Sequence, residues 1–150
     1  EPIREINGLF KLAFIEDPWG TKIEVVEDHE WLGFHHIHLR SPDPAVTLSW
    51  YADIFGGTRD SLKGRISGLR YGTVWLLVTP HEGELAPTEG RAFDHLGWQF
   101  PDLRAEAENI KRKGVEFDIE VRPFTNPLGE EMLISFVTGP DGVRIEIVQP

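Results

Sequence analysis

Two stretches with the same residue pattern, FHHIHLRSPD at 34–43 and FDHLGWQFPD at 93–102, decide the fold. Phe, His, Pro and Asp coincide at one constant offset, and apolar residues coincide at two further positions. Each stretch alternates like a β-strand and then enters a helical pattern, which Ser41 or Asp43 can cap in the first copy. A shared constellation at one offset indicates an internal duplication.

A second pair of matching segments links the beginning of the chain to its end. LFKLAFIEDPWGTKIEVVE at 9–27 aligns with EMLISFVTGPDGVRIEIVQ at 131–149, and Glu24 coincides with Glu146. The later segment is predicted to form the closing two strands of a unit. Residues 1–30 are therefore expected to be the C-terminal hairpin of a preceding module, with a plain N-terminal β-hairpin as the alternative.

Each complete module has the predicted order β-α-β-β-β. The first module covers residues 34–80, with a strand at 34–41, a helix at 44–55 and strands near 58–65, 67–72 and 73–79. The second module covers residues 93–150, with a strand at 93–100, a helix at about 102–114 and strands near 116–122, 131–138 and 143–149. The Gly- and Pro-rich segment 81–92 is typical of a linker. Neither module can bury its apolar faces alone, so we expect an α+β fold of paired βαβββ modules.

Composition excludes several classes of protein. No apolar run of about 18 residues exists, which argues against a membrane span. The formal net charge of -10 argues against a nucleic-acid partner, because such proteins carry basic patches. The lack of cysteine excludes disulfides and thiolate chemistry, so any metal must be bound by His, Asp or Glu. We expect a soluble protein, cytoplasmic by default, whose partner is a small-molecule substrate.

The duplicated βαβββ unit, with HHIHLRSPD, DHLGWQFPDL and GPDGVRIEIVQ in this order, resembles the vicinal oxygen chelate superfamily. That superfamily includes glyoxalase I, extradiol dioxygenases, methylmalonyl-CoA epimerase and the fosfomycin and bleomycin resistance proteins. The resemblance covers residues 34–150 as two modules and residues 9–27 as a partial one. It implies a U-shaped, partly closed sheet cavity around one divalent metal ion. Modules of this superfamily pair within or between chains, which leaves a homodimer open.

Carried over residue by residue, the resemblance assigns His36, His95 and Glu146 as metal ligands. Two imidazoles and one carboxylate suit Fe²⁺, Mn²⁺, Ni²⁺ or Zn²⁺. A fourth ligand would come from the last strand of the first module, TVWLLV, where Trp75 or Leu76 takes its place. The chain therefore departs from the four-ligand pattern of its relatives.

Side-chain alternation places the three carried-over ligands on the polar faces of their strands, independently of the resemblance. His38 shares a face with His36, and we expect it to contact substrate or act as an acid or base rather than to bind the metal directly. A hydrogen-bonded cavity histidine is the other alternative. His35 is expected to point the other way. The remaining candidates for substrate binding lie on or near the same faces: Arg40, Trp75, Gln99 and Arg144.

The sequence leaves two functions open. The first is a divalent-metal-dependent enzyme of the glyoxalase/dioxygenase type, a lyase or oxidoreductase. Its substrate would be small, oxygen-rich and chelated by the metal, for isomerisation, lyase or ring-cleaving dioxygenase chemistry. Glyoxalase-type isomerisation lacks its usual second carboxylate here, and EMLISFVT lacks the tyrosine typical of extradiol dioxygenases. The second is a metal-free small-molecule binding or resistance protein of the bleomycin-sequestering type.

Overall fold

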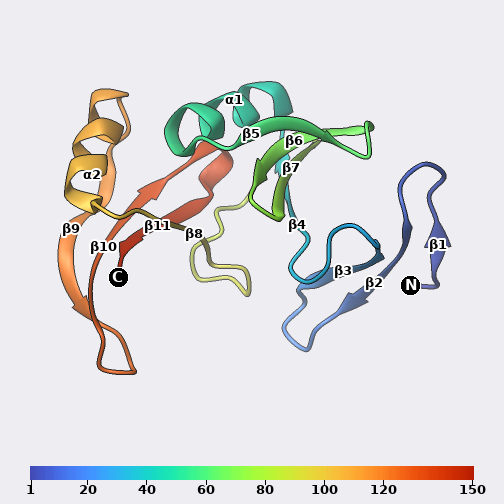
Figure 1. Cartoon of the computed structure of the whole chain (residues 1–150), viewed down its shortest axis with the longest axis horizontal. Helices are drawn as coiled ribbons and strands as arrows, with labels where there is room; N and C mark the ends of the chain where they lie inside the picture. Colours follow the sequence, from blue (N-terminus) through green and yellow to red (C-terminus); the bar gives the residue numbers. More distant parts are fainter. The chain divides into compact units, whose positions relative to one another are not determined.

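The two copies in the sequence become two units in the structure. The computed structural model describes residues 1–150, and the chain divides into the units Glu1–Gly83 and Glu84–Pro150 (Figure 1). Each unit contains one module with the order β-α-β-β-β. The α+β fold class and the order of the elements are therefore confirmed. Neither of the two α-helices is long and apolar enough to cross a membrane.

The first repeated stretch opens a four-stranded sheet. Strand β4 (His36–Ser41) pairs in parallel with β7 (Val74–Pro80). The sheet continues through β6 (Ile66–Tyr71) and β5 (Thr58–Leu62), which are joined as antiparallel neighbours. The resulting order, β4-β7-β6-β5, places the two parallel strands side by side at one edge.

Helix α1 (Pro44–Phe55) begins where the sequence predicts it. The Asp43 carboxylate accepts hydrogen bonds from the backbone N–H groups of Ala45 and Val46, so Asp43 caps the helix. Gly56 ends the helix at φ +70°, a conformation that favours glycine. The helix packs on β7, β4 and β6 through a buried apolar face: Leu48, Tyr51, Ile54 and Phe55.

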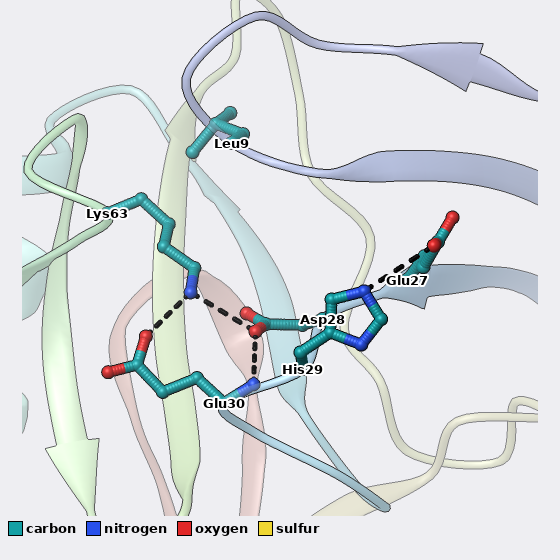
Figure 2. Close-up of a pocket in the computed structure, with 6 residues that line it drawn as sticks. All are labelled: Leu9, Glu27, Asp28, His29, Glu30 and Lys63. Carbon is teal, nitrogen blue, oxygen red and sulfur yellow. Dashed lines mark hydrogen bonds and ion pairs between the residues drawn. The ribbon is translucent and has the colours of Figure 1, made fainter.

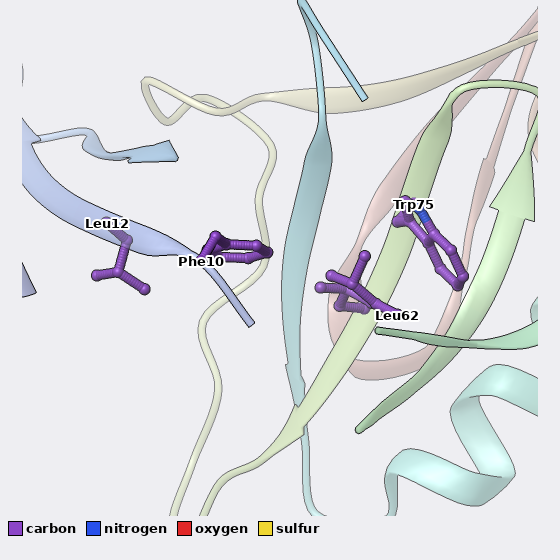
Figure 3. Packing of buried hydrophobic residues seen from close by; sticks show 5 residues of the cluster. Phe10, Leu12, Leu62 and Trp75 are labelled. Atoms are coloured by element: carbon purple, nitrogen blue, oxygen red, sulfur yellow. The ribbon is translucent and has the colours of Figure 1, made fainter. Parts of the chain in front are cut away.

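The N-terminal residues form their own small sheet inside the first unit. It consists of β1 (Arg4–Glu5), β2 (Lys11–Glu16) and β3 (Lys22–Glu27), in that order. An apolar cluster joins this hairpin to the four-stranded sheet, and its members are Phe10, Leu12, Leu62, Trp75 and Leu77 (Figure 3). Trp75 and Leu77 pair with His36 and His38 across the parallel strands, so all four share one face of the sheet. The hairpin therefore packs on the face that carries these histidines.

The second unit repeats this construction without a covering hairpin of its own. Its sheet has the order β8-β11-β10-β9, and its strands are β8 (His95–Gln99), β9 (Phe117–Thr125), β10 (Glu131–Thr138) and β11 (Arg144–Gln149). Helix α2 (Leu103–Arg112) is capped by the Asp102 side chain, as the repeated Pro-Asp pair leads one to expect. The helix buries Leu103, Ala107 and Ile110 and packs on β9 and β11.

The strand register corrects one expectation about the missing fourth ligand. In the second unit Glu146 lies opposite Gly97, two residues after His95. The corresponding partner in the first unit lies opposite His38, and that residue is Leu77. Leu77, rather than Trp75 or Leu76, therefore occupies the position where relatives carry a ligand. It is fully buried in the apolar cluster beneath the hairpin.

Candidate metal centre

Three potential metal ligands converge in the first unit. Glu24 comes from β3 of the hairpin, while His36 and His38 come from β4. The Glu24 Oε2 atom lies 3.3 Å from Nε2 of His36 and 3.4 Å from Nε2 of His38. One ligand atom from each residue fits within 4.8 Å of the others. The contact between hairpin and sheet thus assembles this donor set from segments that are separate in the sequence.

The centre is largely shielded from water. The side chains of His36 and Glu24 are 5% and 11% exposed, whereas that of His38 is 34% exposed. Burial alone would raise the pKa of Glu24, but the hydrogen bonds and charges of His36 and His38 lower it to about 2. The carboxylate is therefore ionised at neutral pH, and His38 is the member of the set that is open to an incoming molecule.

The spacing of the donor atoms fits one divalent cation. Ligand atoms bound at about 2.1 Å from a metal lie roughly 3.0–3.4 Å apart in octahedral or tetrahedral geometry. The two nitrogen–oxygen distances at Glu24 reach this range. Two imidazoles and one carboxylate form a set that leaves coordination positions open, as iron(II) and related ions use in enzymes. The residues therefore fit a catalytic rather than a closed structural metal site.

Hydrogen bonds on the Nδ1 side of the His36 ring hold it in place. Its Nδ1 atom lies 2.7 Å from Nδ1 of His35, and Nε2 of His35 lies 3.3 Å from Oδ2 of Asp28. Nε2–H of His36 donates to Glu24 when no cation is bound. With a cation bound, Nδ1–H of His36 can donate to His35 and Nε2–H of His35 to Asp28, which leaves the Nε2 lone pair of His36 for the cation. Such partners orient metal-binding imidazoles and strengthen them as ligands.

Asp28 is held in place by hydrogen bonds from two residues that line a neighbouring pocket. Oδ1 of Asp28 accepts hydrogen bonds from the backbone N–H of Glu30, at 2.8 Å, and from Nζ of Lys63, at 3.1 Å. Figure 2 shows these contacts in an open pocket of about 430 Å³, whose other lining residues include Leu9, Glu27 and His29. Burial would raise the pKa of Asp28, but these hydrogen bonds and that of His35 lower it to about 2. Asp28 therefore presents a fixed negative charge to His35.

The second unit contains a His–Glu pair with similar distances, but both of its residues come from neighbouring strands of one sheet. Nε2 of His95 lies 3.5 Å from Oε2 of Glu146, and its Nδ1 lies 2.7 Å from Oδ1 of Asp94. Asp94 precedes His95 as His35 precedes His36. No third donor joins this pair, because Gly97 occupies the position that His38 has in the first unit. The His95 side chain is also 38% exposed.

Arg144 is engaged within the second unit. Its Nη1 atom lies 3.0 Å from Oε1 of Glu89 and 3.4 Å from Oδ1 of Asp94. Its guanidinium stands 4.3 Å from the centre of the Phe136 ring, the ring that His95 also meets edge-on. These contacts place Arg144 beside the His95–Glu146 pair, where an anionic group could reach it.

The other predicted substrate residues differ in their surroundings. Arg40 on β4 and Gln99 on β8 are both exposed. Trp75 is 3% exposed in the apolar cluster, and its Nε1–H has no hydrogen-bond partner. A substrate could meet the Trp75 indole only if the covering hairpin moved.

The structure adds two residues that the sequence predictions did not include. Glu24 is the acidic partner of His36, and its coincidence with Glu146 in the repeat was the signal that could have identified it. His35 was expected to point away from the cavity, which is wrong, because its ring contacts His36. His35 precedes β4, so the alternation of that strand does not govern its direction.

A family model for the glyoxalase/bleomycin resistance protein/dioxygenase superfamily matches residues 33–147. The chain belongs to this superfamily. Among curated proteins, the uncharacterized protein YaeR of Escherichia coli is 28% identical over 127 residues, which cover 77% of this chain and 94% of YaeR. The resemblance seen in the repeated motifs is thus confirmed.

Solved structures show the same fold at low identity. A glyoxalase I variant from Zea mays is 22% identical, with a TM-score of 0.72, over 93% of this chain and 54% of the maize chain. The fosfomycin resistance protein FosX from Listeria monocytogenes is 19% identical, with a TM-score of 0.62, over 79% of this chain and 93% of its own. The oxidase ChaP-H2 is 14% identical, with a TM-score of 0.55, over 79% and 94% of the two chains.

Proposed function

We propose that this protein is a divalent-metal-dependent enzyme that acts on a small, oxygen-rich substrate. The observation that carries the proposal is the convergence of Glu24, His36 and His38, whose donor atoms have the spacing of ligands around one ion. The buried relay from Asp28 through His35 to His36 supports it, since such a relay would orient a metal ligand.

The residues of the centre divide into distinct roles. Glu24 and His36 are mostly buried and would hold the cation, while Asp28 and His35 would fix the ring of His36. His38 is the more exposed donor, so it would complete the ligand set on the side from which the substrate approaches. A bound Fe²⁺, Mn²⁺, Ni²⁺ or Zn²⁺ ion would act as a Lewis acid toward two adjacent substrate oxygens. This chemistry suits isomerisation, lyase or ring-cleaving dioxygenase reactions.

The ligand set assigned from the sequence, His36, His95 and Glu146, remains a second proposal for the same activity. The 3.5 Å contact between His95 and Glu146 favours it, because it brings two of the three donors together. His36 belongs to both sets. Its substitution therefore tests metal dependence whichever set is used.

Metal-free binding of a small molecule is the other candidate function. The apolar Leu77 at the missing ligand position and the unpartnered Nε1–H of Trp75 favour it. A binding protein of this kind would hold its ligand by burial and hydrogen bonding, without a cation.

Metal content decides between the enzyme and the binder. Purified protein dialysed against Mn²⁺, Fe²⁺, Ni²⁺ or Zn²⁺ is expected to retain about one ion per chain, because three donors of this kind bind such ions. The His36→Ala variant should lose that ion, whereas His81→Ala, a histidine outside both clusters, should keep it. A wild-type protein that retains no ion from any of the four would refute metal dependence and leave the binding function.

A further inference from the structure

The outer face of the N-terminal hairpin is apolar and bare. Ile15, Ile23 and Val25 are 55%, 41% and 52% exposed. They alternate along β2 and β3 with Leu12, Phe14 and Glu24, which face the rest of the first unit. In register, Ile15 lies opposite Ile23, and Ala13 lies opposite Val25. These four residues, Ala13, Ile15, Ile23 and Val25, form what we call the outer patch.

The second unit contains the same patch in a covered state. The repeat aligns the outer patch with Ser135, Val137, Ile145 and Ile147, and the cross-strand pairs are the same. All four of these residues are 0% exposed. Helix α2 packs against β11 on this face with its buried stripe of Leu103, Ala107 and Ile110. The outer patch of the hairpin therefore lacks the helix that its counterpart has.

The edge of the hairpin sheet is open in the corresponding way. Strand β3 ends the sheet order β1-β2-β3, so one row of its backbone N–H and C=O groups has no neighbouring strand. Its counterpart β11 is paired on that side with β8, in parallel. A single segment, β8 followed by α2, thus supplies in the second unit both the strand and the helix that the hairpin lacks.

We infer that the outer patch and the free edge of β3 form a docking surface for one strand–helix segment of the kind that β8 and α2 form in the second unit. The strand would pair in parallel with β3, and the helix would lie across the outer patch. The helix would carry apolar side chains spaced by four and three residues, with a small one in the middle, as in Leu103, Ala107 and Ile110. This inference does not depend on metal binding.

The spacing of the chain allows a direct test. Arg4 pairs with Leu12 as Arg122 pairs with Ile134, and the repeat aligns Leu12 with Ile134. A copy of residues 93–118 placed directly before Glu1 therefore restores the spacing of a complete module. We expect this extension to slow amide hydrogen exchange in β2 and β3 at least tenfold relative to the unextended protein, because it pairs the edge and covers the patch.

Two matched variants separate docking from mere lengthening. In the first, the added copy carries Leu103→Asp and Ile110→Asp, and the protection should disappear. In the second, Ile23→Thr and Val25→Thr are made in the hairpin of the extended protein, and the slowing of hydrogen exchange in β2 and β3 should fall. The same changes in the unextended protein should alter the exchange rates little, because both side chains are exposed there. Equal protection by the intact and the polar extension would overturn the inference. So would a hairpin that is protected in the unextended protein in a concentration-dependent manner, since a second copy would then be the occupant.

Discussion

The His36 and His95 clusters have similar distances but different construction. In both, Nε2 of a histidine faces a glutamate, at 3.3 Å in the first unit and 3.5 Å in the second. In both, Nδ1 is held at 2.7 Å by the preceding residue, which is His35 in one case and Asp94 in the other. The two pairs are nevertheless built differently, because Glu146 lies in the strand next to His95, whereas Glu24 comes from the separate hairpin sheet and Leu77 holds the equivalent position in the first module.

The clusters differ in their third donor and in their cover. His38 completes the first set, whereas Gly97 stands at that position in the second. The His36 side chain is 5% exposed, because the hairpin covers it, and the His95 side chain is 38% exposed. Charged groups attract a cation more strongly where water is excluded, so the first cluster is the stronger candidate for a metal centre.

The largest expected effect concerns the two glutamates. Glu24→Ala should weaken Mn²⁺ binding by about 100-fold or more, because losing an outer partner alone costs about 10–100-fold and Glu24 is a direct donor. Glu146→Ala should leave the affinity within about twofold. Isothermal titration of both variants measures this difference. The reverse order of effects would favour the ligand set of His36, His95 and Glu146.

The next effect is on stability and comes from Asp28. Its pKa is about 2 instead of the usual 3.8, so its ionised form stabilises the fold above pH 3.8, and this stabilisation is lost as pH falls toward 2. Asp28→Asn should therefore lower the free energy of unfolding by about 2 kcal/mol at pH 7. Urea unfolding at pH 7 and pH 2.5 should show the difference between variant and wild type shrinking in acid.

Asp94 provides the control for Asp28. Its pKa is also lowered, chiefly by hydrogen bonds with His95 and Gly90, but it lies at the surface. Asp94→Asn should cost less stability than Asp28→Asn at pH 7, since water already solvates this carboxylate. Equal losses for the two variants would contradict the contrast in burial between the clusters.

A smaller effect on Mn²⁺ affinity is expected from His35, which contacts Nδ1 of His36. His35→Phe should reduce Mn²⁺ affinity about tenfold, because the ring of His36 loses its partner while the three donors remain. His35→Asn, which keeps a polar group there, should recover part of the loss. Electron paramagnetic resonance of bound Mn²⁺ reports both affinity and ligand geometry. An unchanged spectrum and affinity in His35→Phe would mean that His35 is only a packing residue.

The smallest expected effect is a gain in the second unit. A Cβ atom at Gly97 would meet no atom within 4 Å, so a side chain can be added there. Gly97→His should supply the missing third donor. Because a neutral imidazole binds Zn²⁺, the affinity of the His95–Glu146 pair for Zn²⁺ should rise by roughly several-fold. Gly97→Ala is the matched control. A second ion per chain, detected by metal analysis at high Zn²⁺ concentration in the histidine variant alone, would show the gain.

The repeats predicted the fold well because caps and alternation act locally. Asp43, one of the two predicted caps, begins α1. Helix α2 lies within the predicted range of about 102–114, and β10 spans Glu131–Thr138 as predicted. These features depend on residues that are close together in the sequence, so the sequence pattern alone is enough to predict them.

The candidate centre could be predicted only in part. His36 and His38 follow from alternation, but their contact with Glu24 depends on how the hairpin packs on the sheet. That packing arises from Phe10 and Leu12 meeting Leu62 and Leu77, residues distant in sequence. The position of Leu77 opposite His38 likewise depends on parallel strand register, which the run of apolar residues in β7 leaves undetermined.

The unpartnered indole of Trp75 has a consequence for the motion of the hairpin. A buried N–H group without an acceptor costs about 1–3 kcal/mol, and that cost vanishes when water reaches it. Lifting Phe10 and Leu12 off the sheet would expose the indole, so this cost selectively lowers the energy of opening the hairpin. The same opening carries Glu24 away from His36. The lifetime of the assembled centre would therefore depend on how often this hairpin opens, and Trp75→Phe, which removes the N–H, should lengthen it.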